Sequence, residues 1–179
     1  MDRKVFIEDD DIALIQYTHE DDMDMYTCWL DKETQKGFNF MLDETFEEFI
    51  KTDISEFHFF SSIYDKSTKQ ILGVIRLAPR IYEPDLAIWM FKPYRNKGYG
   101  KKSFLLGLKY CFNILKLEEV FVGCYENNVA SLKLINGLGF SRNGKDDVKE
   151  IEVFTKQDII QLGFSLTFDR FENMISIRA

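Results

Sequence analysis

The chain has 179 residues, with 23 Lys and Arg against 30 Asp and Glu, so its formal net charge is −7. Apolar residues make up 45% of it, enough for one sizeable core at a length typical of one domain. It has no long apolar run and opens on charged residues, so we expect neither a membrane span nor a secretory signal. Acidic clusters at 8–11 and 20–24 disfavour nucleic-acid binding.

The three cysteines are widely spaced, and the chain has only two histidines. This composition argues against a structural zinc site, any other metal centre and a disulfide framework. It fits a reducing compartment, so we expect the protein to be cytoplasmic.

In the first half of the chain, apolar patterns predict two helices and four strands. The strands are expected at 12–15, 57–64, 71–77 and 85–91, with a hairpin joining the second to the third. One helix is predicted to start after Thr18 and another after Asp43, because Thr and Asp are good N-terminal caps. Residues 32–42 are expected to be a loop.

In the second half, the pattern predicts a helix at 101–115, a strand at 118–125, a short helix at 127–136 and a strand at 151–155. Residues 158–179 form an extension of uncertain structure, whose alternating apolar residues suggest added strands or a contact between two copies of the chain. The whole chain, 1–179, is expected to be one domain of the α+β class, with a mixed sheet covered by helices on both faces.

The segment 95–100, Arg-Asn-Lys-Gly-Tyr-Gly, lies between the strand at 85–91 and the helix at 101–115. The first N–H groups of a helix have no partner within it, and the helix dipole adds partial positive charge there. Glycine lets a ligand approach the backbone closely. Strand, short basic turn and helix therefore predict a site for a phosphate-bearing ligand.

The spacing of this turn excludes two common phosphate loops. It lacks the leading glycine of a mononucleotide P-loop, and Ser103 stands where a dinucleotide fingerprint needs its third glycine. The remaining pattern, R-x-x-G-x-G after a strand, resembles the acyl-CoA pyrophosphate loop of the GCN5-related N-acetyltransferase (GNAT) family.

A second motif about 30 residues later strengthens this resemblance. Residues 126–140 contain E-N-x-x-A-S-x-x-L-x-x-x-L-G-F, which resembles the same family's signature, especially in the branch that acetylates ribosomal-protein N-termini. The resemblance covers residues 10–157 and implies the GNAT fold.

The resemblance also implies that acetyl-CoA is the co-substrate. In the family, the pantetheine arm pairs with the strand before the turn, and the pyrophosphate binds to backbone N–H groups of the turn. The residues implied to bind it are Trp89, Met90, Phe91, Arg95, Asn96, Lys97, Gly98, Tyr99, Gly100, Lys101 and Asn128. Asn128 also suits the role of a helix cap.

The implied reaction is acyl transfer from a thioester to an amine, by direct attack within a ternary complex. The chain departs from the common family pattern, because Ile135 replaces a tyrosine acid and Gly123 replaces a glutamate base. Ser131 matches a serine proposed to protonate the leaving thiolate. The carboxylates of Asp85 and Glu126 are then the base candidates. Tyr125 and His58 are weaker ones, and deprotonation through water with no essential base is a further alternative.

The acceptor is expected to be a primary amine, either a small molecule or a peptide N-terminus. Two alternatives belong to other classes. A non-catalytic acyl-CoA-binding module of the same fold would keep the turn and Asn128 but lack acid and base. A purely structural protein would bury the turn, which three nearby cations at a helix start make unfavourable.

Overall fold

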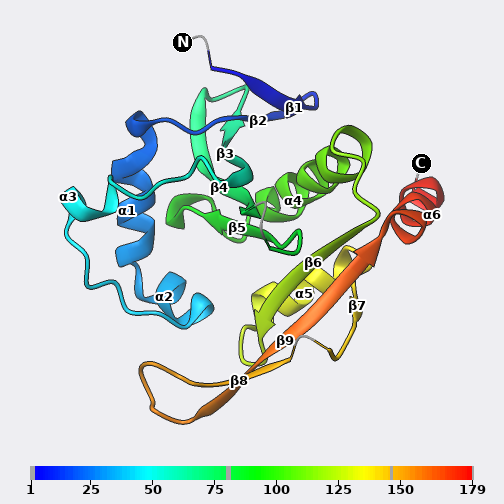
Figure 1. Cartoon of the computed structure of the whole chain (residues 1–179). Coiled ribbons are helices and arrows are strands. Elements are labelled where there is room, and N and C mark those ends of the chain that lie inside the picture. Colours follow the sequence, from blue (N-terminus) through cyan, green and yellow to red (C-terminus); the bar gives the residue numbers. More distant parts are fainter. Residues whose placement is uncertain (1–2, 80–81, 146, 179) are drawn as a thin grey trace.

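The computed structural model describes residues 3–79, 82–145 and 147–178, and it contains two antiparallel sheets that meet at one point (Figure 1). The first sheet has the order β1-β2-β3-β4-β5. Its strands are β1 (Val5–Glu8), β2 (Ile12–Gln16), β3 (Phe57–Asp65), β4 (Gln70–Pro79) and β5 (Leu86–Met90). Every neighbouring pair in it is antiparallel.

The second sheet is built around β9 (Asp158–Thr167). One edge of β9 pairs with β6 (Glu119–Tyr125), and the other pairs with β7 (Ser141–Arg142) and β8 (Val148–Ile151). The sheets join through a parallel bridge between Asp85 and Phe121, where the Phe121 N–H donates to the Pro84 carbonyl at 2.9 Å.

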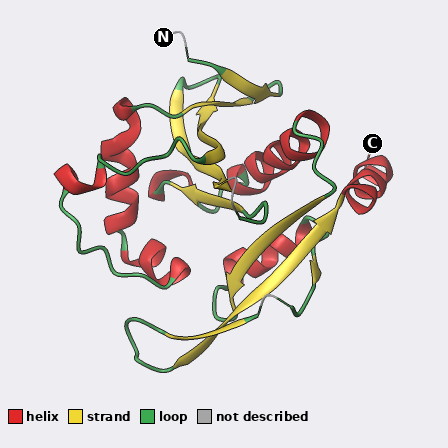
Figure 2. Cartoon of the chain, viewed as in Figure 1, coloured by secondary structure: helices red, strands yellow, loops and turns green. Residues whose placement is uncertain are grey.

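Helices cover both faces of the first sheet (Figures 1 and 2). On one side lie a 3₁₀ turn (His19–Asp21), α1 (Asp22–Leu30), α2 (Lys32–Phe38) and α3 (Phe46–Phe49). On the other lies α4 (Tyr99–Lys109), which follows a 3₁₀ turn (Lys92–Tyr94) and continues as a π-helical turn (Tyr110–Ile114). Helices α5 (Val129–Gly137) and α6 (Phe168–Arg178) belong to the C-terminal half of the chain, which also forms the second sheet.

Alternation of side chains along β5 explains how one strand serves two cores. Trp89 is buried in the cluster below α1, with Met25 and Tyr17. Leu86 belongs to the larger cluster that includes Phe104 of α4, and Ile88 packs against it. Successive strand residues point to opposite faces, so β5 must be apolar throughout.

The α+β class and the helices on both faces are confirmed, and so is the hairpin, now β3 and β4. The strands form two antiparallel sheets with one parallel bridge between them rather than a single mixed sheet. The capping residue of the second predicted helix was wrong. Thr45, not Asp43, caps α3, because its hydroxyl accepts from the Glu48 N–H while the Glu48 carboxylate accepts from the Thr45 N–H.

Residues 32–38 were expected in a loop but form α2. Asp31 caps it by accepting from the Thr34 N–H, and Asn39 ends it with a left-handed φ of 51°. The strand at 5–8 was missed because the acidic run after it masks its short apolar pattern. That run is the turn of the β1–β2 hairpin.

The strand predicted at 151–155 is wrong in position. β8 ends at Ile151, and residues 153–155 form a turn in which the Glu152 carboxylate accepts from the Thr155 N–H. Residues 158–167 are the central strand of the second sheet, which confirms an added strand in the C-terminal extension. Residues 168–178 are helical, so the expectation of a further strand there is wrong.

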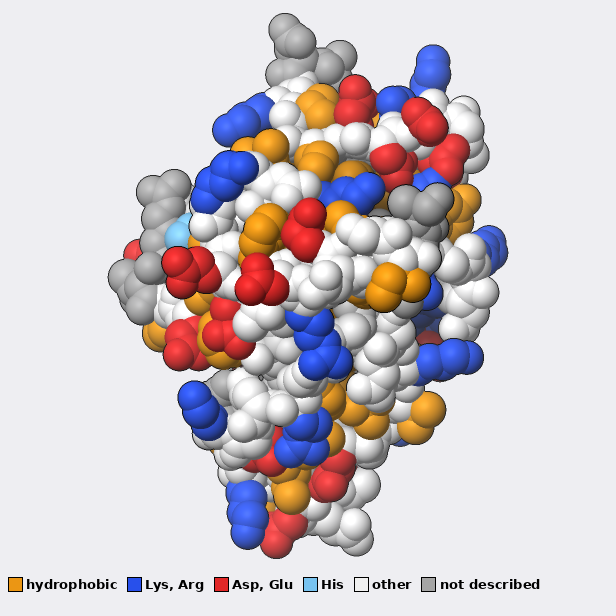
Figure 3. Space-filling view, turned by 90° about the vertical axis from the view of Figure 1, so that its right-hand side faces the viewer, with side chains coloured by type: hydrophobic (Ala, Val, Ile, Leu, Met, Phe, Trp, Pro, Cys, Tyr) orange, Lys and Arg blue, Asp and Glu red, His pale blue; other side chains and the backbone are white. Residues whose placement is uncertain are grey.

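No helix in the described ranges is both long enough and apolar enough to cross a membrane. On the face shown in Figure 3, acidic and basic side chains are interspersed rather than gathered by sign. All three cysteines are buried and free.

Candidate functional site

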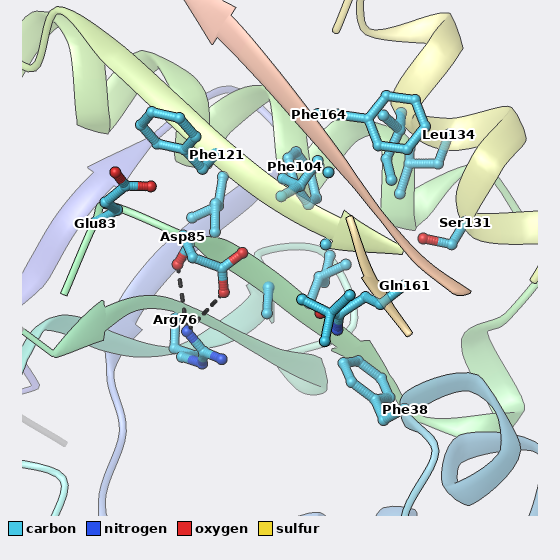
Figure 4. A pocket seen from close by; sticks show the side chains of 18 residues that line it. Phe38, Arg76, Glu83, Asp85, Phe104, Phe121, Ser131, Leu134, Gln161 and Phe164 are labelled. Carbon is cyan, nitrogen blue, oxygen red and sulfur yellow. Dashed lines mark hydrogen bonds and ion pairs between the residues drawn. The ribbon is translucent and has the colours of Figure 1, made fainter. Parts of the chain in front are cut away.

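A cleft opens where β5 and β6 separate from their single bridge. It comprises two cavities, of about 360 Å³ and 640 Å³, which share Phe38, Ile88, Ser131 and Leu134 in their walls. The smaller one lies by the bridge, and the larger one reaches the turn before α4. Figure 4 shows the smaller cavity, with Asp85 and Arg76 on one side and Ser131 on the other.

The pairing of β5 with β4 determines which of its main-chain groups face this cleft. The Ala78 N–H donates to the Asp85 carbonyl at 2.8 Å, and the Phe91 N–H donates to the Leu72 carbonyl at 2.9 Å. Antiparallel pairing alternates, so the odd-numbered residues of β5 bond to β4, whereas Ile88 and Met90 turn their N–H groups to the cleft.

This geometry corrects part of the predicted pantetheine contact. Of Trp89, Met90 and Phe91, only Met90 presents its main chain to the cleft. Its carbonyl already accepts from Nε of Arg95 at 2.9 Å, which leaves the N–H. The Trp89 side chain stacks on Phe38 of α2, with ring centroids 5.0 Å apart.

The opposite wall of the cleft is the free edge of β6. The Glu126 N–H donates to the Ile160 carbonyl of the β9 side, so even-numbered residues of β6 bond to β9. Phe121, Gly123 and Tyr125 therefore direct main-chain groups to the cleft. The cleft is thus flanked by two parallel strand edges that do not pair with each other beyond the Asp85–Phe121 bridge. On the β6 edge, the Phe121 N–H donates to the Pro84 carbonyl and the Tyr125 carbonyl accepts from the Asn128 N–H.

The predicted phosphate turn lies at the open end of the larger cavity. Gly98 precedes α4 with φ of 87°, and no side chain caps this helix end. Asn96 is also left-handed, with φ of 60°. Lys97 and Lys101 are exposed, and neither has an ion-pair partner within the described part of the chain. The first N–H groups of α4 are therefore available to an anion.

Three other residues at or next to this turn make contacts away from the predicted phosphate site. Gly100 packs near the Met90 side chain, since a Cβ on Gly100 would lie 3.5 Å from Cγ of Met90. The Tyr99 hydroxyl donates to the Asp65 carboxylate at 3.3 Å. Lys102 is paired with Asp11.

Arg95 was expected to hold the pyrophosphate, but its side chain turns into the protein. It donates to the Asp31 carboxylate at 2.6 Å, to Glu33 at 3.1 Å and to the Thr34 hydroxyl at 2.7 Å. Further contacts go to the Met90 carbonyl and the Cys28 sulfur. All five N–H donors of the guanidinium are thereby engaged. Burial alone would lower the pKa of Arg95, but hydrogen bonding and the charge of Asp31 outweigh it and raise the pKa.

Asn128, which was expected to bind acetyl-CoA or to cap a helix, caps α5 in the structure. Its Oδ1 accepts from the Ser131 N–H at 3.1 Å, and its Nδ2 donates to the Gly37 carbonyl at the end of α2 at 3.2 Å. The side chain therefore links α5 to α2 beside the larger cavity.

Ser131 lies in the first turn of α5 and lines both cavities. Its side chain lies close to the buried thiol of Cys124 on β6, and that thiol donates to the Tyr125 and Asn128 carbonyls. Burial raises the pKa of Cys124, and the Ser131 contact opposes this rise.

Asp85 is the predicted carboxylate that the structure places in the cleft. Its oxygen lies 3.2 Å from a guanidinium nitrogen of Arg76, and its carboxylate also accepts from the Gly123 N–H. Burial raises the pKa of Asp85, while the charge of Arg76 acts in the opposite direction. Arg76 is itself held over the rings of Phe57 and Trp89.

The other candidate acids and bases lie outside both cavity walls. The exposed carboxylate of Glu126 accepts from the Ile160 N–H at 3.1 Å and so extends the β6–β9 pairing. The Tyr125 hydroxyl donates to Glu150 at 2.7 Å, and burial together with this carboxylate raises its pKa. His58 is half-buried on β3.

Sequence reasoning missed two residues of the cleft, namely Arg76 and Gln161. Arg76 and Gln161 come from strands β4 and β9, and no local pattern indicates that those strands meet β5 and β6. No group of three or more His, Cys, Asp or Glu side chains suited to a metal ion occurs in the described ranges.

Comparisons with known proteins agree with this geometry. Residues 6–141 match the acetyltransferase (GNAT) domain family. The chain is 33% identical over 84 residues to an uncharacterized SPbeta prophage-derived N-acetyltransferase of Bacillus subtilis, YokL, covering 46% of each chain. It is 29% identical over 66 residues to a probable spermine N(1)-acetyltransferase of Bacillus subtilis subsp. natto, covering 37% of this chain and 43% of that protein. The alignments thus span less than half of these relatives.

The fold is similar to that of a spermidine N-acetyltransferase from Vibrio cholerae solved in complex with CoA and spermine. Its TM-score is 0.79 at 15% identity, over 90% of this chain and 98% of that chain. A putative ribosomal-protein-serine acetyltransferase from the same organism has a TM-score of 0.67 at 19% identity, over 90% and 96%. The family match over residues 6–141 and the cleft between β5 and β6 establish that this chain belongs to the GNAT acetyltransferase family.

Proposed function

We propose that the protein transfers the acetyl group of acetyl-CoA to a primary amine, by direct attack within a ternary complex. The observation that carries this proposal is the cleft between β5 and β6. Its edges diverge from the Asp85–Phe121 bridge toward an uncapped helix start. The family match over residues 6–141 and the CoA-bound relative of the same fold support the choice of co-substrate.

The cleft suits the two ends of acetyl-CoA. The pantetheine arm carries amides that can pair with the free edge of β5 at Ile88 and Met90, as an added strand would. The pyrophosphate would lie on the N–H groups at the start of α4, with Lys97 and Lys101 supplying charge. Arg95 would act indirectly, by holding the turn against α2.

The reaction needs a base for the amine, a donor for the oxyanion and a proton for the thiolate. We assign these roles to Asp85, to the Met90 N–H and to Ser131. Asp85 lies in the cleft with a raised pKa, and the Met90 N–H faces the space between the strands. Ser131 lines both cavities. Cys124 is buried and burial raises its pKa, so we assign no covalent relay to it.

A small cationic amine suits the acceptor side better than a peptide N-terminus. The smaller cavity carries the carboxylates of Glu83 and Asp85 (Figure 4). The relatives named above include a probable spermine acetyltransferase and a spermidine acetyltransferase solved with spermine. A polyamine would bring its ammonium groups to these carboxylates.

The test is calorimetric titration of the protein with acetyl-CoA, with two variants of one residue. Gly98→Asp adds a negative charge where the phosphates would bind. Gly98→Asn is the matched control, because it has the same shape and also tolerates a positive φ. No atom lies within 4 Å of the added Cβ, so neither variant clashes. We expect tight binding by wild type, weaker binding by Gly98→Asn and none by Gly98→Asp.

An acceptor screen then separates the enzyme from the non-catalytic module. A panel of polyamines, small monoamines and a peptide is added with acetyl-CoA, and free thiol is measured. Release of CoA that depends on the amine supports transfer. Binding of acetyl-CoA without release by any amine would favour the module, and no binding by wild type would overturn both readings.

A further inference from the structure

We propose that the carboxamide of Gln161 binds the acceptor nitrogen and thereby selects primary over secondary amines. This inference rests on the proposed acetyl transfer and adds a contact to the acceptor. Gln161 lies on β9, in the wall of the smaller cavity (Figure 4).

The position of Gln161 follows from the absence of a side chain at Gly123. A Cβ on Gly123 would lie 3.1 Å from both Cδ and Nε2 of Gln161, and 3.4 Å from Oε1. The carboxamide therefore packs directly over this stretch of β6. The N–H of the same glycine donates to the Asp85 carboxylate. Gln161 and Asp85 thus contact one residue at the cleft edge and face one small space.

The carboxamide has unused hydrogen-bonding capacity. No hydrogen bond to its side chain occurs within the described ranges, although the residue is half-buried in the cavity wall. Because its amide atoms are accessible from the cavity rather than buried, they are available to a polar ligand that enters it. Being neutral, it adds no charge beside Asp85 and Arg76.

The chemistry of the attack gives this pair a selective role. A neutral primary amine has one lone pair and two N–H bonds. With one N–H donating to Asp85 and the other to Oε1 of Gln161, the lone pair is left to attack the thioester carbon.

As the C–N bond forms, the nitrogen loses the first proton to Asp85, and the C–S bond breaks as the thiolate takes a proton from Ser131. The second N–H stays on the product amide, still bonded to Gln161. A secondary amine has a single N–H, which goes to Asp85, so it leaves Gln161 without a partner.

The experiment compares a primary amine with its N-methyl analogue in wild type and in Gln161→Met. Methionine keeps the length and volume of the side chain but removes the amide. Wild type is expected to prefer the primary amine, and Gln161→Met is expected to lower kcat/KM for it about 10- to 50-fold, the effect of one lost hydrogen bond in a polar site. Turnover of the N-methyl amine should change less than about twofold, so that the preference largely disappears.

Two further variants make the result specific. Gln157→Met is the matched control, because Gln157 is exposed on the turn before β9. It should behave as wild type. Gly123→Ala pushes the carboxamide aside by its 3.1 Å contact and should also weaken the preference. This second route tests the inference even if Gln161→Met fails to fold.

The outcomes separate the inference from the proposed function. If wild type acetylates the primary amine and Gln161→Met lowers kcat/KM for both amines equally, or for neither, the inference is wrong and the proposed function stands. If wild type binds no acetyl-CoA in the titration, the proposed function fails and the inference falls with it.

Discussion

Arg95 and Asp31 join the turn before α4 to the start of α2, with a nitrogen–oxygen distance of 2.6 Å. Both side chains are largely buried, with 20% and 13% of their surface exposed. At the other end of α2, Asn128 donates to the Gly37 carbonyl. Two residues expected to bind acetyl-CoA therefore fasten α2, and with it Phe38, beside the cleft.

Replacing Arg95 by Gln should destabilise the protein. The change leaves the carboxylate of Asp31 without its strongest partner, and breaking one side of a largely buried pair costs about 2–4 kcal/mol. Urea unfolding of Arg95→Gln, Asp31→Asn and the double variant measures the coupling between the two. The exposed Lys97→Gln should change the free energy of unfolding little. Additive single effects would show that the pair contributes nothing.

Two substitutions of Asn128 should separate its two contacts. Asn128→Ala removes both contacts. The loss of the helix cap alone should lower the free energy of unfolding by about 1–2 kcal/mol. Asn128→Asp keeps an acceptor for the Ser131 N–H but loses the donor to Gly37. We expect near-normal stability of α5 and faster hydrogen exchange in residues 32–38. Exchange in α2 equal to wild type would show that this bond does not hold the helix.

The strand, turn and helix around 95–100 could be predicted from sequence because each signal there is local. Gly98 needs a positive φ, and Asn128 is a good cap wherever it precedes a helix. The direction of Arg95 could not be predicted, because its acceptors at the start of α2 are 61 to 64 residues earlier. A basic residue in a phosphate loop suggests that its side chain binds a ligand. In the structure, the Arg95 side chain instead binds the acidic residues at the start of α2.

The same limit explains the errors at the C-terminal end. Phe164 and Leu166 have the alternation of a strand, and they lie in one. Nothing local says that this strand pairs with β6 and so brings Gln161 to Gly123. Ile175 and Ile177 alternate by chance within α6, where Ile175 packs on the core and Ile177 is 87% exposed.

Ser131→Ala should lower turnover more than acetyl-CoA binding. Alanine keeps the backbone N–H that Asn128 caps, so α5 should remain intact. The loss of a proton donor to the thiolate should reduce kcat about 10- to 100-fold, with the acetyl-CoA Kd within about twofold of wild type. Ser131→Thr retains a hydroxyl and should recover part of kcat. Unchanged kcat in Ser131→Ala would remove this residue from the mechanism.

The pH dependence of activity should report the pairing of Asp85 with Arg76. Burial raises the pKa of Asp85 above its ordinary value, and the guanidinium of Arg76 limits this rise. A base works only when ionised, so kcat/KM should rise as pH increases through this pKa. Arg76→Gln removes the opposing charge and should shift the acid limb of the profile to higher pH.

The control for this shift is Arg170→Gln, which makes the same change at an exposed position of α6. The amine substrate titrates identically in all variants, so a difference between profiles reports the protein. The charged side chains in the walls of this cavity are Arg76, Glu83 and Asp85, and Glu83→Gln should move the limb the other way, because it removes a like charge.

The same pKa has a consequence for stability with a defined sign. The folded-state pKa of Asp85 lies above the unfolded value, so the folded protein binds this proton more tightly. The free energy of unfolding should therefore fall as pH rises from the unfolded to the folded pKa of this group. Asp85→Asn should remove that dependence and abolish most turnover. An acid limb that survives in Asp85→Asn would identify another group, or water alone, as the acceptor of the proton.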